Sequence, residues 1–526
     1  MKSIKKVVAL LLVSALVIGV TGCGTGGSSS TASSDNKVRV AMQDPNVPID
    51  PQKQTNSYLM MVADQVVEPL INLDNDGNLS PLLIKEMPKV SADGLTYSFE
   101  LKDAKFHNGE MVKSSDVKYS FERLLTKGVM GAMVDQIQGA QGLVDKTATS
   151  LEGFKIIDDK KFDLVLEQPY SPFTSALATT YVCVYPEKAC EEAGADWGRT
   201  VLYGTGPYKM DKFTAGQGIE VSKFDDYHGE KAKNNGVSFK FIEDMNTQVM
   251  EYQKGNVDVL QLDATLYPNY KDTAEIKDDI HSFNPIGLVY LAPNMELTAD
   301  PKVREALTYA IDRKTICEDL LHGTATPAKT FIPKGLVGYD DSVPDFEYNP
   351  AKAKQILTDA GYADGVTIEM PVSTKYSFLV KVATAIQDQA KAAGININIT
   401  QVDGAAYSDM AKGGTVPLAI SNWYVDYIDP DGMIYQRMSS TTTMHNSSSK
   451  YNNPEFNALI DEARTITDEA KRQELYSKAD KILTRQDYGA VPILNETKFY
   501  LSKPYVKNFK VTDMFRFHFN TAELSK

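Results

Sequence analysis

The chain has 526 residues, of which 42% are hydrophobic and 24% are charged, a balance typical of globular proteins. Its 55 Lys and Arg residues are outnumbered by 69 Asp and Glu residues, so the formal net charge is −14. This acidic balance argues against nucleic acid as a partner, because nucleic-acid binding demands a basic face. For the same reason the folded body has no electrostatic attraction to anionic lipid.

Residues 1–22 have the layout of an export signal, with three lysines before an uncharged, mostly apolar run at 7–20. A transmembrane helix needs roughly 20 apolar residues, so this run is short for a span. It ends in Val20-Thr-Gly-Cys23, which resembles the lipobox of bacterial lipoproteins. The resemblance implies cleavage before Cys23 and a lipid on its sulfur. Residues 23–36, rich in Gly, Ser and Thr, then form a lipidated, flexible tether.

The body after residue 36 is larger than one hydrophobic core usually supports, so we expect two lobes. It opens with Lys37–Ala41, whose alternating pattern is typical of an edge strand. Other segments have strand-like patterns, namely 94–101, 162–166, 236–242, 257–261, 367–370 and 395–399.

Helix starts are marked by an N-cap residue followed by proline, at Asp300-Pro301, Asn349-Pro350 and Asn453-Pro454. Gly361 stops the second of these helices. Strands that alternate with capped helices after residue 290 predict an α/β lobe with a largely open sheet.

Three cysteines remain in the body: Cys183, Cys190 and Cys317. Cys183 and Cys190 could form a disulfide in an exported protein, and two buried thiols are an equal alternative. The six histidines show no metal-ligand spacing, so we expect neither a metal site nor a cofactor.

The stretch at 416–432 carries the most chemistry. An apolar strand, Val416–Ile420, leads to Trp423, Tyr424 and Tyr427, with Asp426 among these rings. A poorly hydrated carboxylate needs a cation or several hydrogen-bond donors, and a ligand could supply the cation. The alternative is a solvated acid in a tyrosine-rich loop.

Several motifs along the chain carry a family resemblance. They are Tyr97-Ser-Phe-Glu-Leu-Lys-Asp-Ala-Lys-Phe-His-Asn-Gly-Glu110 with Ser115-Asp-Val-Lys-Tyr-Ser-Phe-Glu-Arg123, Tyr203-Gly-Thr-Gly-Pro-Tyr208, Val303-Arg-Glu-Ala-Leu-Thr-Tyr-Ala-Ile-Asp-Arg313, and Trp423-Tyr-Val-Asp-Tyr-Ile-Asp-Pro430. Together they resemble the extracellular solute-binding proteins of the oligopeptide/dipeptide/nickel type, which serve ABC importers. The resemblance runs from about Val38 to the last strand and is closest to the peptide-binding members.

The resemblance implies an α/β, two-lobed periplasmic-binding-protein-like fold of the large peptide-binding type, with a ligand cleft between the lobes. We place lobe 1, with an extra N-terminal subdomain, at 37–288 plus 495–526, and lobe 2 at 289–494. The chain would cross between them near 289–294 and 488–494, and the two crossings could act as a hinge.

The resemblance also implies the binding residues. Asp426 would take the α-ammonium of a peptide that lies extended in the cleft. Asp429 and Asp431 are then interpreted as turn residues. The arginine that clamps the carboxylate in dipeptide-specific members is absent, and Lys375 is the closest cation, which makes longer peptides more plausible. The full candidate set is Asp426, Trp423, Tyr424, Tyr427, Tyr290, Asn56, Ser57, Lys375 and Tyr376.

The function implied is the lipid-anchored, extracytoplasmic component of an ABC importer that captures peptides, with oligopeptides favoured, as a monomer and delivers them to permease and ATPase subunits. The alternatives keep the fold and change the ligand to a nickel chelate, an oligosaccharide or a peptide pheromone. An enzyme is not expected, because the chain has no G-x-S-x-G elbow, no P-loop and no metal-ligand spacing.

Overall fold

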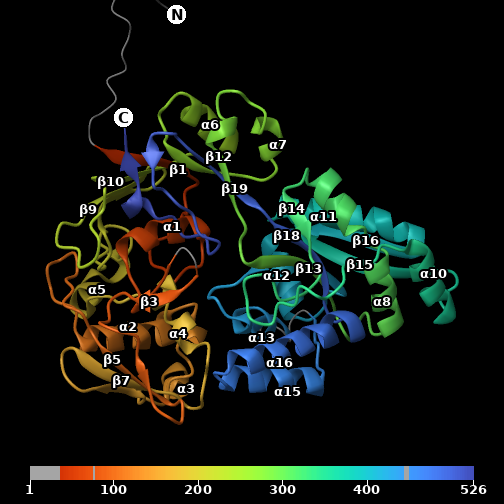
Figure 1. Cartoon of the computed structure of the whole chain (residues 1–526), viewed down its shortest axis with the longest axis horizontal. Helices are drawn as coiled ribbons and strands as arrows, with labels where there is room; N and C mark the ends of the chain where they lie inside the picture. The colour runs from red at the N-terminus through yellow and green to blue at the C-terminus, as the bar shows by residue number, and fades with distance from the viewer. Residues whose placement is uncertain (1–35, 75–76, 443–448, 526) are drawn as a thin grey trace, which may run out of the picture. The chain divides into compact units, whose positions relative to one another are not determined.

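The computed structural model describes residues 36–74, 77–442 and 449–525, and two groups of elements, which we call the first and second lobe, account for its sheets (Figure 1). The first lobe is built on a seven-stranded sheet and a smaller four-stranded sheet. The second lobe is built on another four-stranded sheet and a parallel pair of strands.

The seven-stranded sheet has β1 at its centre. Its strands, in spatial order, are β12 (Ile280–Phe283), β19 (Lys498–Ser502), β11 (Val259–Leu262), β1 (Lys37–Met42), β10 (Gly236–Phe241), β9 (Gly218–Lys223) and β8 (Tyr208–Thr214). The edge position predicted for residues 37–41 is therefore wrong, because β1 pairs in parallel with both β10 and β11. The charge of Arg39, in the middle of β1, is accommodated by the buried Asp258, whose Oδ2 accepts a 3.0 Å hydrogen bond from Arg39 Nε.

The smaller sheet of the first lobe forms the core of an N-terminal subdomain. It runs β4 (Lys89–Val90), β5 (Thr96–Glu100), β7 (Lys161–Val165), β6 (Phe154–Ile156), all antiparallel. Tyr97 and Phe99 of β5 point into this core, as the alternation predicts. The motif residue Arg123 is buried, and its Nη2 lies 2.6 Å from Asp50 Oδ2, which joins α2 (Ser114–Lys127) to the loop before α1.

The remaining elements of the first lobe are short strand pairs and helices. They are β2 (Ile71–Leu73) with β3 (Leu79–Pro81), β20 (Val506–Lys507) with β21 (Glu523–Leu524), and the helices α1 (Ser57–Val66), α3 (Ala140–Val144), α4 (Phe173–Ala176), α5 (Glu187–Ala193), α6 (Met245–Gln253) and α7 (Tyr267–Tyr270).

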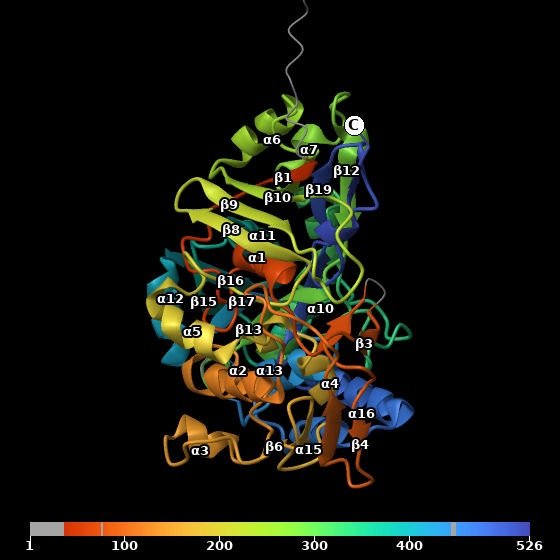
Figure 2. The same cartoon turned by 90° about the vertical axis from the view of Figure 1, so that its left-hand side faces the viewer.

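The glycines of the Tyr203–Tyr208 motif let the chain pass directly against the end of α1, next to β8 (Figure 2). A Cβ on Gly204 would overlap the carbonyl oxygen of Val66, and one on Gly206 would lie 2.6 Å from that of Gln65. Gly206 N also donates to Val66 O at 3.0 Å. The motif therefore fixes the position of α1 by close backbone packing.

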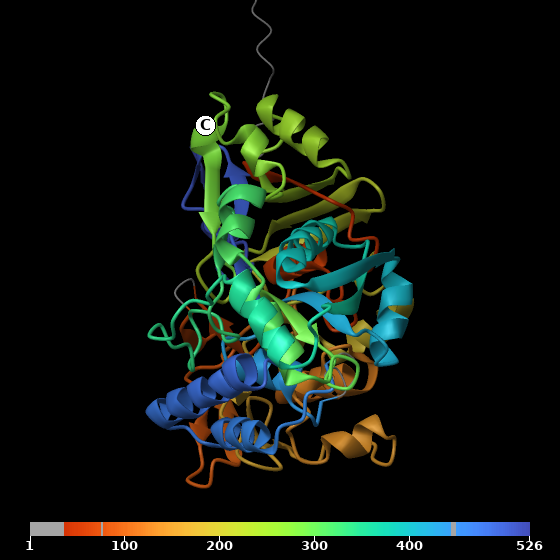
Figure 3. The ribbon, with the colours of Figure 1, turned by 90° about the vertical axis from the view of Figure 1, so that its right-hand side faces the viewer.

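The second lobe combines an antiparallel four-stranded sheet, a parallel pair of strands and several helices. Its sheet runs β14 (Ala325–Pro327), β18 (Val491–Glu496), β13 (Gly287–Pro293), β17 (Leu418–Tyr424), and beside it β15 (Val366–Ser373) pairs in parallel with β16 (Ile395–Val402). Its helices are α8 (Pro301–Tyr309), α9 (Arg313–Thr315), α10 (Pro350–Asp359), α11 (Ser377–Ala390), α12 (Gly404–Lys412), α13 (Ile434–Met438), α15 (Pro454–Thr465) and α16 (Glu469–Lys481). Figure 3 shows α15 and α16 packed side by side.

The predicted helix starts are confirmed. Asp300, Asn349 and Asn453 each accept a hydrogen bond from a backbone N–H of the first turn, and proline follows each of them. Gly361 adopts a left-handed φ of 92° just after α10, as a helix stop requires.

The chain changes sheets between β12 and β13, at residues 284–286, and again between β18 and β19, at Thr497. The crossings predicted near residues 289–294 and 488–494 lie a few residues from these changes of sheet, in β13 and at the start of β18. Thr497 Oγ1 donates to Asn284 Oδ1 at 3.0 Å, so the two crossings contact each other. The residue bounds given for the two lobes stay a prediction.

Cys183, Cys190 and Cys317 are all free and buried, so the disulfide alternative is wrong. Within the described ranges, no helix combines the length and the apolar character that crossing a membrane requires. Residues 1–35, with the predicted signal and Cys23, lie outside the described part of the chain.

The close packing at Gly204 predicts a large effect of one methyl group. Gly204→Ala should lower the free energy of unfolding by about 3 kcal/mol, because neither backbone can move away without disturbing the core. Gly131→Ala is the matched control, since a Cβ there meets nothing closer than 3.6 Å. Urea unfolding measures both variants, and equal stability of the two would contradict this reading of the motif.

Candidate ligand-binding site

The loop that follows β17 begins where the second lobe meets the first crossing. β17 pairs with β13 along its whole length, up to the pair Tyr424–Gly287. The pairing ends when Val425 N donates to Ile286 O at 3.0 Å. Among the described residues, β13 is the only strand hydrogen-bonded to β17, so this pairing fixes where the loop begins.

Three aromatic residues lie at the end of β17 and in the loop after it, and the hydrogen-bonding groups of all three are paired within the protein. Trp423 Nε1 donates to Gly432 O at 2.9 Å, and the Tyr424 hydroxyl donates to the buried carboxylate of Glu496. The Tyr427 hydroxyl donates to Asp431 Oδ2 at 2.6 Å. These side chains therefore have little hydrogen-bonding capacity left for a ligand.

The carboxylate of Asp426 has one oxygen that pairs with no described residue. Its Oδ2 atom is buried and makes no hydrogen bond within the described residues. Burial alone raises the pKa of Asp426 to about 7. Buried polar atoms are nearly always paired, so an unpaired carboxylate oxygen calls for a donor or a cation from outside the chain.

Residues of the first lobe lie within electrostatic reach of Asp426. Burial, followed by the negative charges of Asp426 and Asp64, raises the pKa of Tyr181. Burial also raises the pKa of Asp64 on α1, and the charge of Arg516 and the hydroxyl of Thr180 oppose that rise. Tyr181 thus lies within electrostatic reach of both Asp426 and Asp64, and Arg516 lies within reach of Asp64.

Asp64, Tyr181 and Arg516 were missed by the sequence analysis. Asp64 is the single acid in the otherwise uncharged helix α1, and Arg516 interrupts the apolar and aromatic run Met514 to Phe519. Such isolated charges in apolar surroundings are a usable signal of a functional or paired group.

Tyr290 lies in the core of the second lobe. Its side chain is buried, its ring packs edge-on against Phe331, and its hydroxyl accepts a 3.0 Å hydrogen bond from Arg437 Nε. The guanidinium of Arg437 lies 4.6 Å above the Trp423 ring. Tyr290 is therefore connected, through Arg437 and Trp423, to residues 425–432, which we call the Asp426 loop.

The other four predicted residues lie on two separate segments. Asn56 is the N-cap of α1, where its Oδ1 accepts from Tyr58 N and Leu59 N, and Ser57 is the exposed first residue of that helix. Lys375 and Tyr376 are exposed between β15 and α11, with Lys375 Nζ 5.2 Å from the Tyr376 ring centroid. In the part of the chain that the structure describes, no hydrogen bond, ion pair or ring contact joins any of the four to the loop after β17, and their role in binding stays a prediction.

Asp429 and Asp431 are more than turn residues, which corrects the sequence analysis. Both are buried. Both oxygens of Asp429 accept 2.8 Å hydrogen bonds from Arg472 Nη2, and Asp431 Oδ1 lies 2.5 Å from Arg464 Nε. Burial still raises the pKa of Asp429, to about 6, although Arg472 opposes it. Helices α15 and α16 supply these arginines, so the loop is anchored by ion pairs on one side of Asp426.

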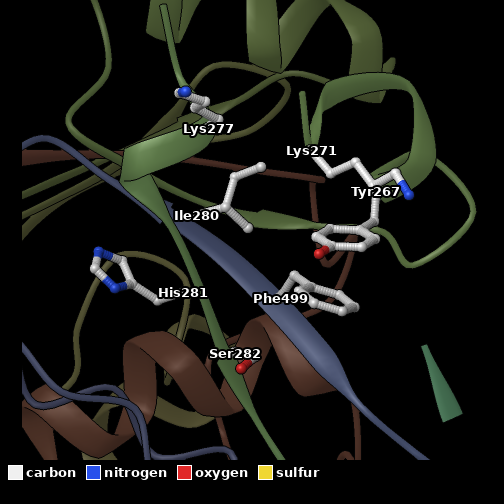
Figure 4. Close-up of a pocket in the computed structure, with 7 residues that line it drawn as sticks. All are labelled: Tyr267, Lys271, Lys277, Ile280, His281, Ser282 and Phe499. Atoms are coloured by element: carbon white, nitrogen blue, oxygen red, sulfur yellow. The ribbon is translucent and has the colours of Figure 1, made fainter. Parts of the chain in front are cut away.

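Two cavities lie elsewhere. One of about 120 Å³ lies beside β12 and β19, where the rings of Tyr267 and Phe499 stack 4.0 Å apart and His281 points away from them (Figure 4). The other, of about 430 Å³, lies between α8 and β15. None of the predicted binding residues lines either cavity. Among the described residues, no three His, Cys, Asp or Glu side chains gather closely enough to hold a metal ion.

Comparison with protein families gives a match over residues 78–445 to the bacterial extracellular solute-binding proteins, family 5. The chain belongs to this family. The dipeptide-binding protein of Escherichia coli is 29% identical over 468 residues, which cover 84% of this chain and 85% of that protein. Heme-binding protein A of Haemophilus influenzae is 26% identical over 472 residues, with the same coverage of each chain.

The fold prediction is confirmed by solved structures. The periplasmic binding protein DppA from Helicobacter pylori, in complex with the peptide STSA, superposes with a TM-score of 0.77. The superposition covers 93% of this chain and 98% of that one, at 22% sequence identity. The chain therefore has the α/β, two-lobed fold of the periplasmic binding proteins.

The unpaired carboxylate predicts a stability test of Asp426. The folded pKa of this acid is about 7, above its ordinary value of 3.8, so its ionisation opposes folding as the pH rises from about 4 to 7. Asp426→Asn should equal the wild type in stability near pH 4 and exceed it by about 2–4 kcal/mol at pH 8. Urea unfolding at the two pH values measures this difference.

Asp409→Asn is the control for that experiment, because it removes an exposed carboxylate of the same lobe. It should change stability little at either pH. An Asp426→Asn variant that is less stable than the wild type at pH 8 would show that the carboxylate has a structural partner.

The ion pairs predict a contrasting result for a neighbouring group. Arg472→Met leaves Asp429 buried without its partner and should lower the free energy of unfolding by about 3–5 kcal/mol. Lys471→Met, one position earlier, breaks only an exposed contact with Glu474 and should cost less than about 1 kcal/mol. A small loss in the Arg472 variant, measured by urea unfolding, would contradict the anchoring of the loop.

Proposed function

We propose that this chain is the lipid-anchored, extracytoplasmic component of an ABC importer and that it captures peptides by their amino end. The carboxylate of Asp426 binds the α-ammonium group of the peptide. The peptide lies in a cleft between the lobes, and the closed protein delivers it to the permease. The lipid on Cys23 keeps the protein at the membrane, because the acidic body has no affinity of its own for anionic lipid.

The unpaired Oδ2 of Asp426 is the observation that carries the peptide assignment. Family membership alone does not select the ligand, because similar relatives are named for dipeptides and for heme. A carboxylate with a buried, unpaired oxygen favours a ligand with a localised positive charge. A peptide offers that charge at one fixed position, whatever its side chains are.

The main chain of the peptide supplies the rest of the affinity in this proposal. An extended peptide can pair with strand-like segments of both lobes through its own N–H and C=O groups, which makes recognition tolerant of side chains. Lys375 stays the proposed partner of the carboxylate end. As a lysine it offers a point charge rather than a bidentate clamp, which suits peptides of varied length.

The assignment predicts that the amino group and Asp426 act as a pair. Tetraalanine should bind the wild type, and N-acetylation of the peptide or Asp426→Asn should each weaken binding by roughly 100-fold or more, since each leaves a buried charge without its partner. Acetylated tetraalanine should bind the variant no worse than it binds the wild type, because the interaction is already lost. Isothermal titration calorimetry measures all four affinities.

Asp409→Asn serves again as the control and should bind tetraalanine with unchanged affinity. Undiminished binding of the acetylated peptide to the wild type would overturn the role of Asp426. Cleavage of the peptide during the titration, detected by mass spectrometry, would overturn the assignment as a binding protein without catalysis.

A further inference from the structure

Tyr170 makes a contact from the first lobe to the second. Its ring lies in the core of the N-terminal subdomain, where it is 4% exposed. Its hydroxyl donates to Asp431 Oδ2 at 2.7 Å and lies 3.2 Å from the Tyr427 hydroxyl. Asp431 lies in the Asp426 loop of the second lobe. Its buried carboxylate therefore receives one hydrogen bond from Tyr170 of the first lobe and one from Tyr427 of the second.

The next residue, Ser171, binds the second lobe independently. Its backbone N–H donates to Arg464 O at 2.8 Å, and its hydroxyl lies 3.0 Å from the same oxygen. Arg464 is also the arginine that faces Asp431 Oδ1. Residues 170 and 171 of the first lobe therefore bind two parts of the second lobe, the carboxylate of Asp431 and the C-terminal end of α15.

Tyr427 connects this contact to the ligand site. It is the residue after Asp426, its side chain is 3% exposed, and it packs in the hydrophobic core of the N-terminal subdomain. Its hydroxyl shares the Asp431 acceptor with Tyr170. The position of Asp426 thus depends on side chains of both lobes.

We propose that Tyr170 is a positioning residue for ligand binding: through Asp431 and Tyr427 it fixes the Asp426 loop only when the lobes are together. The proposal rests on the function proposed above. When the lobes separate, Asp431 keeps Tyr427 and Arg464 and loses Tyr170. The contact therefore favours the closed arrangement, and a ligand that binds only that arrangement binds more tightly because of it.

The test compares two tyrosine-to-phenylalanine variants in the same core. Tyr170→Phe removes the hydroxyl that reaches Asp431. Tyr97→Phe removes a hydroxyl that makes no hydrogen bond within the described part of the chain, from a side chain 5% exposed. Tyr170→Phe should weaken tetraalanine binding about tenfold, mainly through faster dissociation, whereas Tyr97→Phe should leave it unchanged.

A second readout follows the lobes without a peptide. Fluorophores on Ile157→Cys and Leu297→Cys, which are 61% and 53% exposed, report the distance between the lobes by energy transfer. The native body cysteines are buried, and Cys23→Ser removes the remaining thiol, so labelling is selective. Tyr170→Phe should lengthen this distance in the ligand-free protein, Ser171→Ala should lengthen it less, and Tyr97→Phe should not change it.

The outcomes separate the two proposals. An unchanged distance and unchanged affinity in Tyr170→Phe, with or without a loss of stability, would overturn the positioning role and leave peptide binding intact. If the wild type fails to bind tetraalanine, the proposed function is overturned, and the ligand-free distance still decides whether Tyr170 holds the lobes together.

Discussion

One oxygen of the Asp426 carboxylate is buried where no described residue pairs with it, and the surrounding structure maintains that condition. Strand pairing of β17 with β13 brings the loop to the meeting point of the two lobes. Three aromatic residues close to it in the sequence direct their polar atoms to other acceptors. An unpaired buried carboxylate opposes folding, and proteins tolerate such a cost at positions where function requires it.

Three acids within six residues illustrate how context decides the role of a side chain. Asp429 and Asp431 are as buried as Asp426 or more so, yet each faces an arginine. Those two ion pairs fix the loop, and Asp426 is the acid of the three that forms no ion pair within the described residues. Removing a paired acid and removing the unpaired one should therefore have opposite effects on stability. Structural and functional carboxylates can be separated in this way without any knowledge of the ligand.

Local features of the fold could be predicted from the sequence. Asp300, Asn349 and Asn453 begin helices because their side chains satisfy free backbone N–H groups nearby, which requires no tertiary information. The same holds for the strands with alternating burial, such as β5. The candidate loop was found because aromatic rings and an acid occur together within a few positions.

Features that depend on distant segments could not be predicted. The sequence of β1 is typical of an edge strand, because no neighbouring residue indicates that β10 and β11 pair with its two edges. Asp429 meets an arginine 43 positions away, so its local pattern indicates only a turn. Asp64, Tyr181 and Arg516 reach the site from three separate elements, and a sequence pattern cannot show that they converge.

The most direct measurement of the central claim is the number of protons released when a peptide binds. At pH 6 the free carboxyl of Asp426 is mostly protonated, because its pKa is about 7, and the bound ammonium requires the ionised form. Calorimetry of tetraalanine binding in two buffers of different ionisation enthalpy should show release of most of one proton per peptide at pH 6. The Asp426→Asn variant, where it still binds, should release none. Binding by the wild type without proton release at pH 6 would contradict the account.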